Sequence, residues 1–307
     1  MSNYPAVNWV THGMNLFDYR PAIGPDSKTL IFERTFAQKP HFTQLFVTMI
    51  GSSEVLPFIP SIPAQQTRAD WHWPSNRVAF CSDGVWTING DGSDATAIPN
   101  TAGFSYPQWN RDGESLTVMN TNELSAIPKP CSSVINLQGT ITHPNINGTD
   151  DERQWLFGGM PAANPLNGNR IAYAGQPDTD HWKEGKTGYL QEYNYIFINE
   201  TSDEINFTSY PMEPGAPLKG YDSAFQGRAP AWSPDGKYIV FESTRKNDSF
   251  ALFLYNMEKQ TVTQLTGTSV QAQHGKFFPD GKKVIFCGKP SKASQNRIGW
   301  IDISDLL

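Results

Sequence analysis

Short runs of β-branched and aromatic residues recur along the chain, and a polar turn precedes each of them. The clearest examples are APAWSPDGKYIVFE (229–242) and HGKFFPDGKKVIFC (274–287). In both, Pro-Asp-Gly separates two apolar runs: the proline presets φ, the aspartate caps the turn, and the glycine adopts a positive φ. The pattern therefore predicts two antiparallel strands joined by a tight turn.

The same pattern occurs six times. The other four copies are RPAIGPDSKTLIFE (20–33), DWHWPSNRVAFC (70–81), YPQWNRDGESLTVM (106–119) and MPAANPLNGNRIAYA (160–174). When the second-to-last residue of each copy is taken as equivalent, the spacings run from 38 to 68 residues. Those positions are Phe32, Phe80, Val118, Tyr173, Phe241 and Phe286. Repeats of this size made of short strands are typical of β-propeller blades.

Two further alternating strands follow the strand pair in several copies, for example in LFLYNMEKQTVTQLT (252–266). We therefore expect an all-β, six-bladed β-propeller with four antiparallel strands in each blade, formed by residues 1–307 as a single domain. The last copy has a third strand at RIGWIDI (297–303) and lacks a fourth. We expect AVNWVTH (6–12) to supply that strand, because closing the ring removes its exposed edges.

This repeat resembles the TolB-like, WD-like β-propeller repeat, whose signature is close to P-x-W-S-P-D-G-K-x-I-x-F. The fifth copy matches it almost letter for letter, the first and sixth match well, and the second to fourth lack the full Pro-Asp-Gly. Through its periodicity, the resemblance covers nearly the whole chain. It implies the fold more specifically than the function, since the repeat occurs in translocation-associated scaffolds, in peptidase gating domains and in propeller polysaccharide lyases.

The composition narrows the classes of partner. A formal charge of −6 and a pI near 5.5 argue against nucleic acid, whose binding depends on clustered Lys and Arg. The sequence shows neither a signal peptide nor an apolar stretch long enough to span a bilayer. Three cysteines cannot all pair. We expect a cytoplasmic monomer, although a periplasmic or secreted chain whose leader had been removed would have the same sequence.

Repetition also suggests roles for the aromatic residues and for two of the cysteines. Trp73, Trp109, Trp232 and Phe277 are taken as one repeat position, and we expect them to pack between adjacent blades rather than to form stacking platforms. Cys81 and Cys287 are taken as equivalent buried positions.

Function is expected where the repeat is interrupted. Four long insertions (34–43, 175–193, 210–227 and 288–296) fall between the second and third strands of a blade or between blades. In a propeller such connections share one face, here called the upper face, whereas the Pro-Asp-Gly turns lie on the lower face. We therefore expect a ligand to bind on the upper face.

The residues that begin each innermost strand are expected to ring the upper end of the central channel. They are Arg20, Asp70, Tyr106, Met160, Ala229 and His274, preceded in two copies by Arg228 and Gln273. A structural alternative remains: an Arg20–Asp70 ion pair between blades and a buried His274 with its hydrogen bonds satisfied. The candidate ligand-binding residues are Arg20, Asp70, His72, Tyr106, His181, Tyr221, Arg228, Gln273 and His274.

No catalytic motif accompanies the repeat. The sequence has no G-x-S-x-G, H-E-x-x-H, C-x-x-C or P-loop. The peptidases that resemble this propeller carry a hydrolase domain that the chain as written lacks. DTDHWKEG (178–185) concentrates ionisable groups but fits neither a calcium loop nor a zinc motif, so we interpret it as a solvated loop. We predict no cofactor, while leaving open a divalent metal at the channel mouth.

The favoured interpretation is a binding or scaffold propeller that recognises a protein, a peptide or a saccharide. The alternative is a lyase or glycosidase acting on acidic oligosaccharides. Propeller lyases that resemble this repeat place His, Arg and often a metal at the channel mouth, which implies catalytic roles for Arg20, Tyr106, Arg228 and His274, with His72, Asp70 and His181 as helpers. The grouped His and Gln ligands of those lyases are missing, apart from the Gln273–His274 pair.

Overall fold

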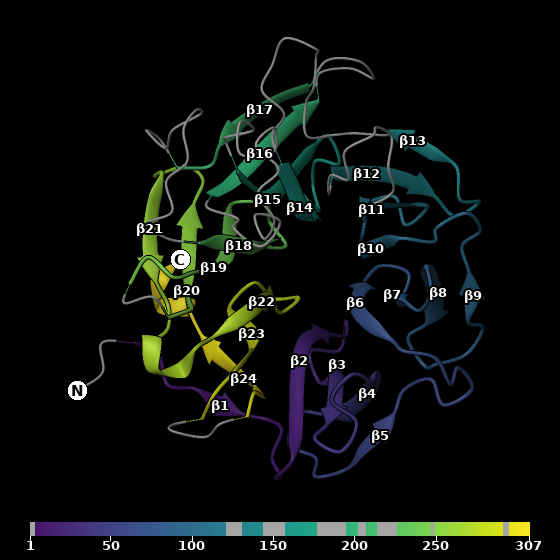
Figure 1. Ribbon diagram of the computed structural model, residues 1–307. Coiled ribbons are helices and arrows are strands. Elements are labelled where there is room, and N and C mark those ends of the chain that lie inside the picture. The colour runs from purple at the N-terminus through teal and green to yellow at the C-terminus, as the bar shows by residue number, and fades with distance from the viewer. Residues whose placement is uncertain are drawn as a thin grey trace, which may run out of the picture.

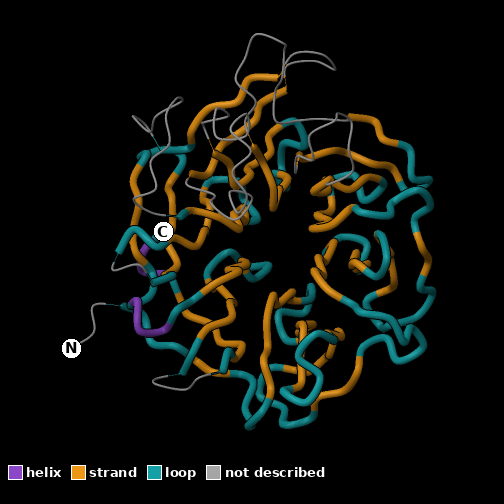
Figure 2. Tube along the Cα trace, viewed as in Figure 1, coloured by secondary structure: helices purple, strands orange, loops and turns teal. Residues whose placement is uncertain are grey.

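A computed structural model describes residues 4–120, 131–143, 157–176, 195–201, 207–213, 226–246, 249–290 and 295–307. Six four-stranded antiparallel sheets are arranged in a ring, as the sequence predicts (Figure 1). The innermost strands β2, β6, β10, β14, β18 and β22 face the centre of the ring, and strands dominate the whole trace (Figure 2). No helix in the described part of the chain is long and apolar enough to cross a membrane.

Blades one to five are each built from four consecutive strands. Blade one comprises β2 (Leu16–Ile23), β3 (Thr29–Phe36), β4 (Thr43–Met49) and β5 (Val55–Pro57), and blade two comprises β6 (Thr67–His72), β7 (Arg77–Cys81), β8 (Val85–Asn89) and β9 (Thr96–Ala97). Blade three comprises β10 (Phe104–Trp109), β11 (Ser115–Asn120), β12 (Cys131–Asn136) and β13 (Ile141–His143).

The second half of the chain continues in the same order. Blade four comprises β14 (Phe157–Ala163), β15 (Arg170–Gln176), β16 (Tyr195–Thr201) and β17 (Phe207–Pro211), and blade five comprises β18 (Gly227–Trp232), β19 (Tyr238–Ser243), β20 (Ala251–Asn256) and β21 (Thr261–Gln264). Blade six comprises β22 (Gln273–Phe277), β23 (Lys283–Gly288), β24 (Arg297–Asp302) and, from the other end of the chain, β1 (Asn8–Trp9).

The N-terminal strand closes the ring as expected. Asn8 pairs with Trp300 and Trp9 with Gly299, both antiparallel. A Cβ on Gly299 would lie 2.9 Å from the Trp9 ring, so only glycine allows the two strands to approach this closely. Arg297 reinforces the closure, because its guanidinium donates to the carbonyl oxygens of Gly13 and Leu16 in the connection from β1 to β2.

The second strand of each blade lies in the core. The six positions identified as equivalent in the sequence are all fully buried, with 0% exposure of each side chain: Phe32, Phe80, Val118, Tyr173, Phe241 and Phe286. The near-continuous apolar runs in the sequence reflect this burial on both faces of the strand.

Every innermost strand carries a β-bulge at the same place, where the register against the second strand shifts. One residue in each bulge, here called the bulge residue, has a positive φ between 41° and 57°. The six bulge residues are Arg20, Arg68, Tyr106, Met160, Ala229 and His274. The expectation that Asp70 holds this position in blade two was wrong: Arg68 holds it, and Asp70 lies two residues further down the strand.

The aromatic alignment needs the same correction of two residues. Trp71 pairs with Val78, as Trp109 pairs with Leu116 and Trp232 with Ile239, so Trp71 and not Trp73 occupies the shared aromatic position. The expected role between blades holds: the indole N–H of Trp232 donates to the carbonyl oxygen of Ala162 in blade four.

Side chains from one blade form hydrogen bonds with the backbone of the bulge residue in the next blade. Glu33 of blade one accepts the backbone N–H of Arg68 at 2.6 Å, and Glu242 of blade five accepts that of His274 at 2.6 Å. Cys81 and Cys287 hold the corresponding places and hydrogen-bond the backbone of Tyr106 and Arg20. The two cysteines are buried as expected, and they also cap the neighbouring blade.

Candidate functional site

The bulge residues meet at the upper end of the central channel and enclose a small cavity of about 50 Å³, here called the upper cavity. Among the bulge residues, Arg20, Arg68, Tyr106 and His274 are polar, and Met160 and Ala229 are apolar; Gln108 and Lys276 also line the cavity. A positive φ turns each of these residues out of the regular strand alternation, so that six blades present one side chain each toward the channel.

Arginine and tyrosine side chains are stacked on the wall of the upper cavity. The Arg68 guanidinium lies 4.5 Å from the centre of the Tyr106 ring, and that of Arg20 lies 5.7 Å from it. Nη2 of Arg20 also donates to the Tyr106 hydroxyl at 3.3 Å. These contacts fix the phenol ring between two cations.

Most cations around the upper cavity have a carboxylate partner. Arg20 pairs with Glu33 at 2.8 Å, and Arg228 pairs with Glu242. Arg20 therefore does not pair with Asp70, and that part of the structural alternative was wrong. Among the residues that the structure describes, Arg68 has no carboxylate partner, and its side chain makes one long hydrogen bond, 3.5 Å, to the Thr67 hydroxyl.

The buried atoms of this cluster include donors that remain unused. Nε of Arg20 and Nε of Arg68 are buried without a hydrogen-bond acceptor in the described part of the chain. A buried donor without an acceptor is unfavourable unless a ligand or water satisfies it. The residues around the upper cavity thus combine buried, unused N–H donors with one positive charge that has no carboxylate partner among the described residues.

This positive potential contributes to a low pKa of the His274 imidazole. Burial first, and then repulsion from Arg20, Arg228, Arg68 and Lys276, holds the pKa of His274 well below its usual value. His274 is therefore neutral at physiological pH. The pKa of Glu242 is raised by burial, while Arg228 and the His274 N–H act in the opposite direction.

Below the upper cavity, an ion pair and the side-chain amide of a glutamine close the channel. Nζ of Lys276, from blade six, lies 3.0 Å from Oδ1 of Asp70 in blade two and 2.6 Å from Oε1 of Gln108 in blade three. We call these three residues the channel plug. They occupy equivalent positions, two residues beyond the bulge residue, where the other three blades carry Ala22, Ala162 and Ala231.

The candidate residues are divided among several places. Arg20, Tyr106 and His274 line the upper cavity, and Arg228 supports it through Glu242. Gln273 lies in a separate surface depression beside Tyr19. Asp70 and His72 lie on the lower side of the channel. His181, Tyr221 and the 178–185 cluster lie outside the described residues.

His72 has a structural role. Its ring nitrogens lie 2.7 Å from the Ser75 hydroxyl and 3.4 Å from the carbonyl oxygen of Arg111, and its ring packs on Trp109. Three residues of the channel were not identified from the sequence: Arg68, Gln108 and Lys276. Their signal is present in the repeat, because they stand at the bulge position or two residues after it.

The described residues contain no group of three or more His, Cys, Asp or Glu side chains that could hold a metal ion. The donor set of the upper cavity is cationic, and such a set favours an anion over a metal cation.

Comparison with known proteins agrees with the architecture. No family model matches the chain. Dipeptidyl-peptidase 5 of Porphyromonas gingivalis is 22% identical over 251 residues, which is 72% of this chain and 35% of that protein, so the chain spans only about a third of that relative.

Two solved structures have a similar fold. The putative TolB from Agrobacterium tumefaciens aligns with a TM-score of 0.58 and 14% identity, covering 82% of this chain and 81% of that one. An oligogalacturonate lyase in complex with manganese aligns with a TM-score of 0.56 and 12% identity, covering 98% and 94%. At these identities the likeness establishes the fold alone. The chain is thus a six-bladed β-propeller similar in fold to TolB and to oligogalacturonate lyase.

Proposed function

We propose that the protein is a binding propeller that recognises a protein, peptide or saccharide on its upper face through an acidic group seated in the upper cavity. The observation that carries this proposal is the guanidinium of Arg68, which has no carboxylate partner among the described residues and lies over the Tyr106 ring. A carboxylate or sulfate in the upper cavity would accept hydrogen bonds from the Arg68 guanidinium and neutralise the excess charge.

The size of the upper cavity limits how much of a ligand enters it. A volume of about 50 Å³ accommodates one carboxylate or a small inorganic anion rather than a sugar ring or a side chain. The rest of the ligand is therefore expected to lie outside the channel, on the upper face. The same proposal includes that residues 1–307 form a single, monomeric domain. The cytoplasmic location remains a prediction.

Small anions test the cavity directly. Acetate and sulfate are titrated into the protein in a low-salt, chloride-free buffer, and heat and the ¹⁵N shifts of arginine Nε are followed. We expect saturable binding that Arg68→Gln weakens by about tenfold or more, the scale of a lost charge-assisted hydrogen bond. Arg111→Gln is the matched control, because it removes the same charge from the lower side of the channel.

Binding that is absent, or equal in the wild type and Arg68→Gln, would overturn the acidic-group proposal. The larger ligand is then sought on arrays of acidic peptides and acidic glycans, comparing the wild type with Arg68→Gln. A ligand that the wild type and Arg68→Gln bind with equal affinity does not occupy the upper cavity.

A lyase or glycosidase is the second candidate, favoured by one specific arrangement. A neutral imidazole, a tyrosine hydroxyl and two arginines line the same cavity, and lyase chemistry needs a base beside cations that neutralise a uronate carboxylate. Catalysis ranks below binding because the depressed pKa of His274 makes it a weak proton acceptor. Absorbance of unsaturated uronate, released from pectic and glucuronic oligosaccharides with and without chelator, is the test. Turnover abolished by His274→Asn would support the enzyme.

A further inference from the structure

A second cavity, of about 300 Å³, lies on the opposite side of the channel plug from the upper cavity. It opens between the turns that join the first and second strands of the blades, on the lower face; we call it the lower cavity. Gln108 and Lys276 line both cavities, so the channel plug forms the floor of each. The volume is at the lower end of the range of small-molecule sites and suits a single ring.

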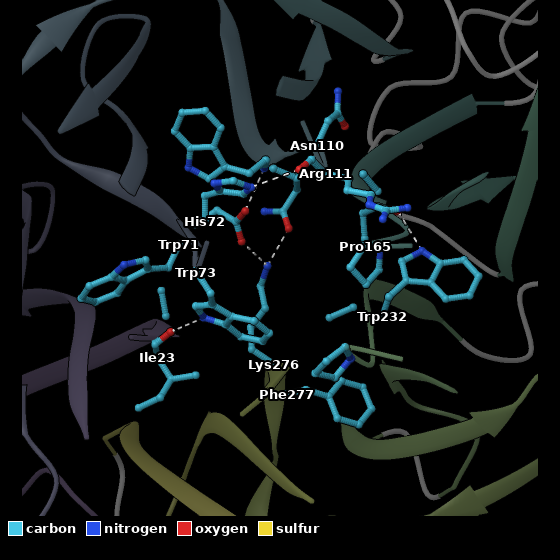
Figure 3. A pocket seen from close by; sticks show the side chains of 18 of the residues that line it. Ile23, Trp71, His72, Trp73, Asn110, Arg111, Pro165, Trp232, Lys276 and Phe277 are labelled. Carbon is cyan, nitrogen blue, oxygen red and sulfur yellow. Dashed lines mark hydrogen bonds and ion pairs between the residues drawn. The ribbon is translucent and has the colours of Figure 1, made fainter. Parts of the chain in front are cut away.

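The wall of the lower cavity is mostly apolar. Trp73, Pro74, Pro165 and Pro234 contribute to it, together with the position three residues beyond each bulge residue, which is buried and aromatic in four blades: Trp71, Trp109, Trp232 and Phe277. Blades one and four carry Ile23 and Ala163 instead, and these smaller side chains leave room. In Figure 3 the ring of Trp73 lies beside Lys276 and Pro165 lies on the opposite side, whereas the rings of Trp71 and Trp232 extend away from Lys276.

The rim is fixed in place. The Trp73 indole N–H donates to the carbonyl oxygen of Ile23 in the preceding blade at 2.8 Å, which sets the orientation of the ring. The Arg111 guanidinium donates to the carbonyl oxygen of Leu166 at 2.8 Å and so ties blade three to blade four. A ligand entering the lower cavity therefore meets a preformed shape.

The floor offers both donors and acceptors and carries no net charge. The Lys276 ammonium has three N–H groups, of which two are directed to Asp70 and Gln108. Oδ2 of Asp70 accepts the Trp109 backbone N–H at 2.9 Å. Each carboxylate oxygen has a further lone pair, so the floor retains one N–H donor and several acceptor positions.

We propose that the lower cavity binds an uncharged pyranose. A carboxylate on the ligand would face Asp70, and an ammonium would face Lys276, so the paired floor selects against either charge. Arg111 adds a positive charge at the rim, where its guanidinium is bound to the carbonyl oxygen of Leu166. A wholly apolar ligand would strip water from the floor and leave its polar atoms unsatisfied. Hydroxyl groups both donate and accept, and the C–H face of a sugar ring packs on aromatic walls. The site is independent of the upper cavity, which lies on the other side of the plug and is cationic.

The test is a titration with four probes: glucose, galactose, mannose and N-acetylglucosamine, each followed by saturation-transfer NMR and calorimetry. At least one is expected to bind saturably. Glucuronate and glucosamine, which add a charge to the same ring, are expected to bind about tenfold more weakly.

Two variants locate the binding. Ala163→Trp places in blade four the residue found at this position in blades two, three and five, narrowing the cavity; it is expected to abolish binding. Ala163→Ser, which adds no comparable volume, is the matched control and should leave binding unchanged. Gln108→Met removes two polar atoms from the floor but leaves the Lys276–Asp70 pair, and a loss of about tenfold is expected. Thermal unfolding checks that each variant folds, and Ala163→Leu replaces the tryptophan variant if it does not.

Three results would overturn the proposal. None of the four sugars binds; or binding survives when Ala163 is enlarged; or binding is lost in Arg68→Gln, which would place the sugar in the upper cavity instead.

Discussion

The carboxylate of Glu242 in blade five accepts the backbone N–H of His274 in blade six at 2.6 Å, and it also pairs with the Arg228 guanidinium. One fully buried side chain thus joins two blades and satisfies a strained bulge. Glu33 repeats the arrangement between blades one and two, where it pairs with Arg20. The charges of the upper cavity are therefore also part of what holds the ring together.

Removing this carboxylate should destabilise the protein strongly. Glu242→Ala leaves Arg228 without its partner and the His274 N–H without an acceptor, so we expect a loss of about 3–5 kcal/mol in the free energy of unfolding. Glu242→Gln keeps an acceptor and should lose less. Urea unfolding measures both, with the exposed Glu258→Ala as control. A change below 1 kcal/mol in Glu242→Ala, on the scale of ordinary surface substitutions, would contradict the role assigned to this carboxylate.

His274 should make stability depend on pH. Its pKa is held below the ordinary value by burial and by repulsion from Arg20, Arg228, Arg68 and Lys276. In the unfolded chain it titrates near pH 6.5. Below that pH the unfolded state binds more protons than the folded state, so stability is lost as pH falls, by up to about 1.4 kcal/mol per pH unit.

The measurement is a difference between two proteins. The raised pKa of Glu242 acts in the opposite direction, because the folded state then holds its proton to higher pH, and other histidines contribute equally to both proteins. His274→Asn removes the imidazole and tolerates a positive φ. Between pH 7 and pH 5 the wild type should lose stability relative to this variant. Parallel curves would mean that His274 titrates as an ordinary surface histidine.

The sequence specifies the blades better than it specifies the channel. The spacing of the buried aromatic positions and the Pro-Asp-Gly turns predicts six blades and the closing strand, because burial of the second strand constrains its composition on both faces. A shift of two residues keeps every side chain on the same face of a strand, so alternation cannot detect it. DWHWP has tryptophans two residues apart, and aligning Trp73 instead of Trp71 moved the expected channel residue from Arg68 to Asp70.

The channel plug could not be predicted for a related reason. Lys276, Gln108 and Asp70 stand in different blades, and contact between them depends on the distance across the ring, which no local pattern encodes. The alanines at the same position of blades one, four and five mark it as facing the channel. Once the bulge is recognised, the position two residues beyond it can be read in all six copies.

Closure by the N-terminal strand predicts a large effect from few residues. Deleting residues 1–12, or replacing Trp9 by alanine, should lower the unfolding midpoint, because Trp9 packs edge-on against Phe286 and lies over Gly299. For Trp9→Ala we expect a loss of about 3 kcal/mol, typical of truncating a packed aromatic. Met14→Ala, at a side chain that is 85% exposed, is the control. An unchanged midpoint after deletion would mean that the ring is closed without this strand.

Cys81 and Cys287 should be unreactive in the folded protein. Burial raises the pKa of the Cys81 thiol to about 11 and that of Cys287 to about 12. At pH 8 at most about one thiol in a thousand is ionised, and the thiolate is the reacting species. In a Cys131→Ser background, Ellman's reagent should label neither cysteine in native buffer and both in urea. Fast native labelling of Cys287 would show that its thiol does not stay buried as the cap of the Arg20 bulge, and that the junction of blades six and one opens in solution.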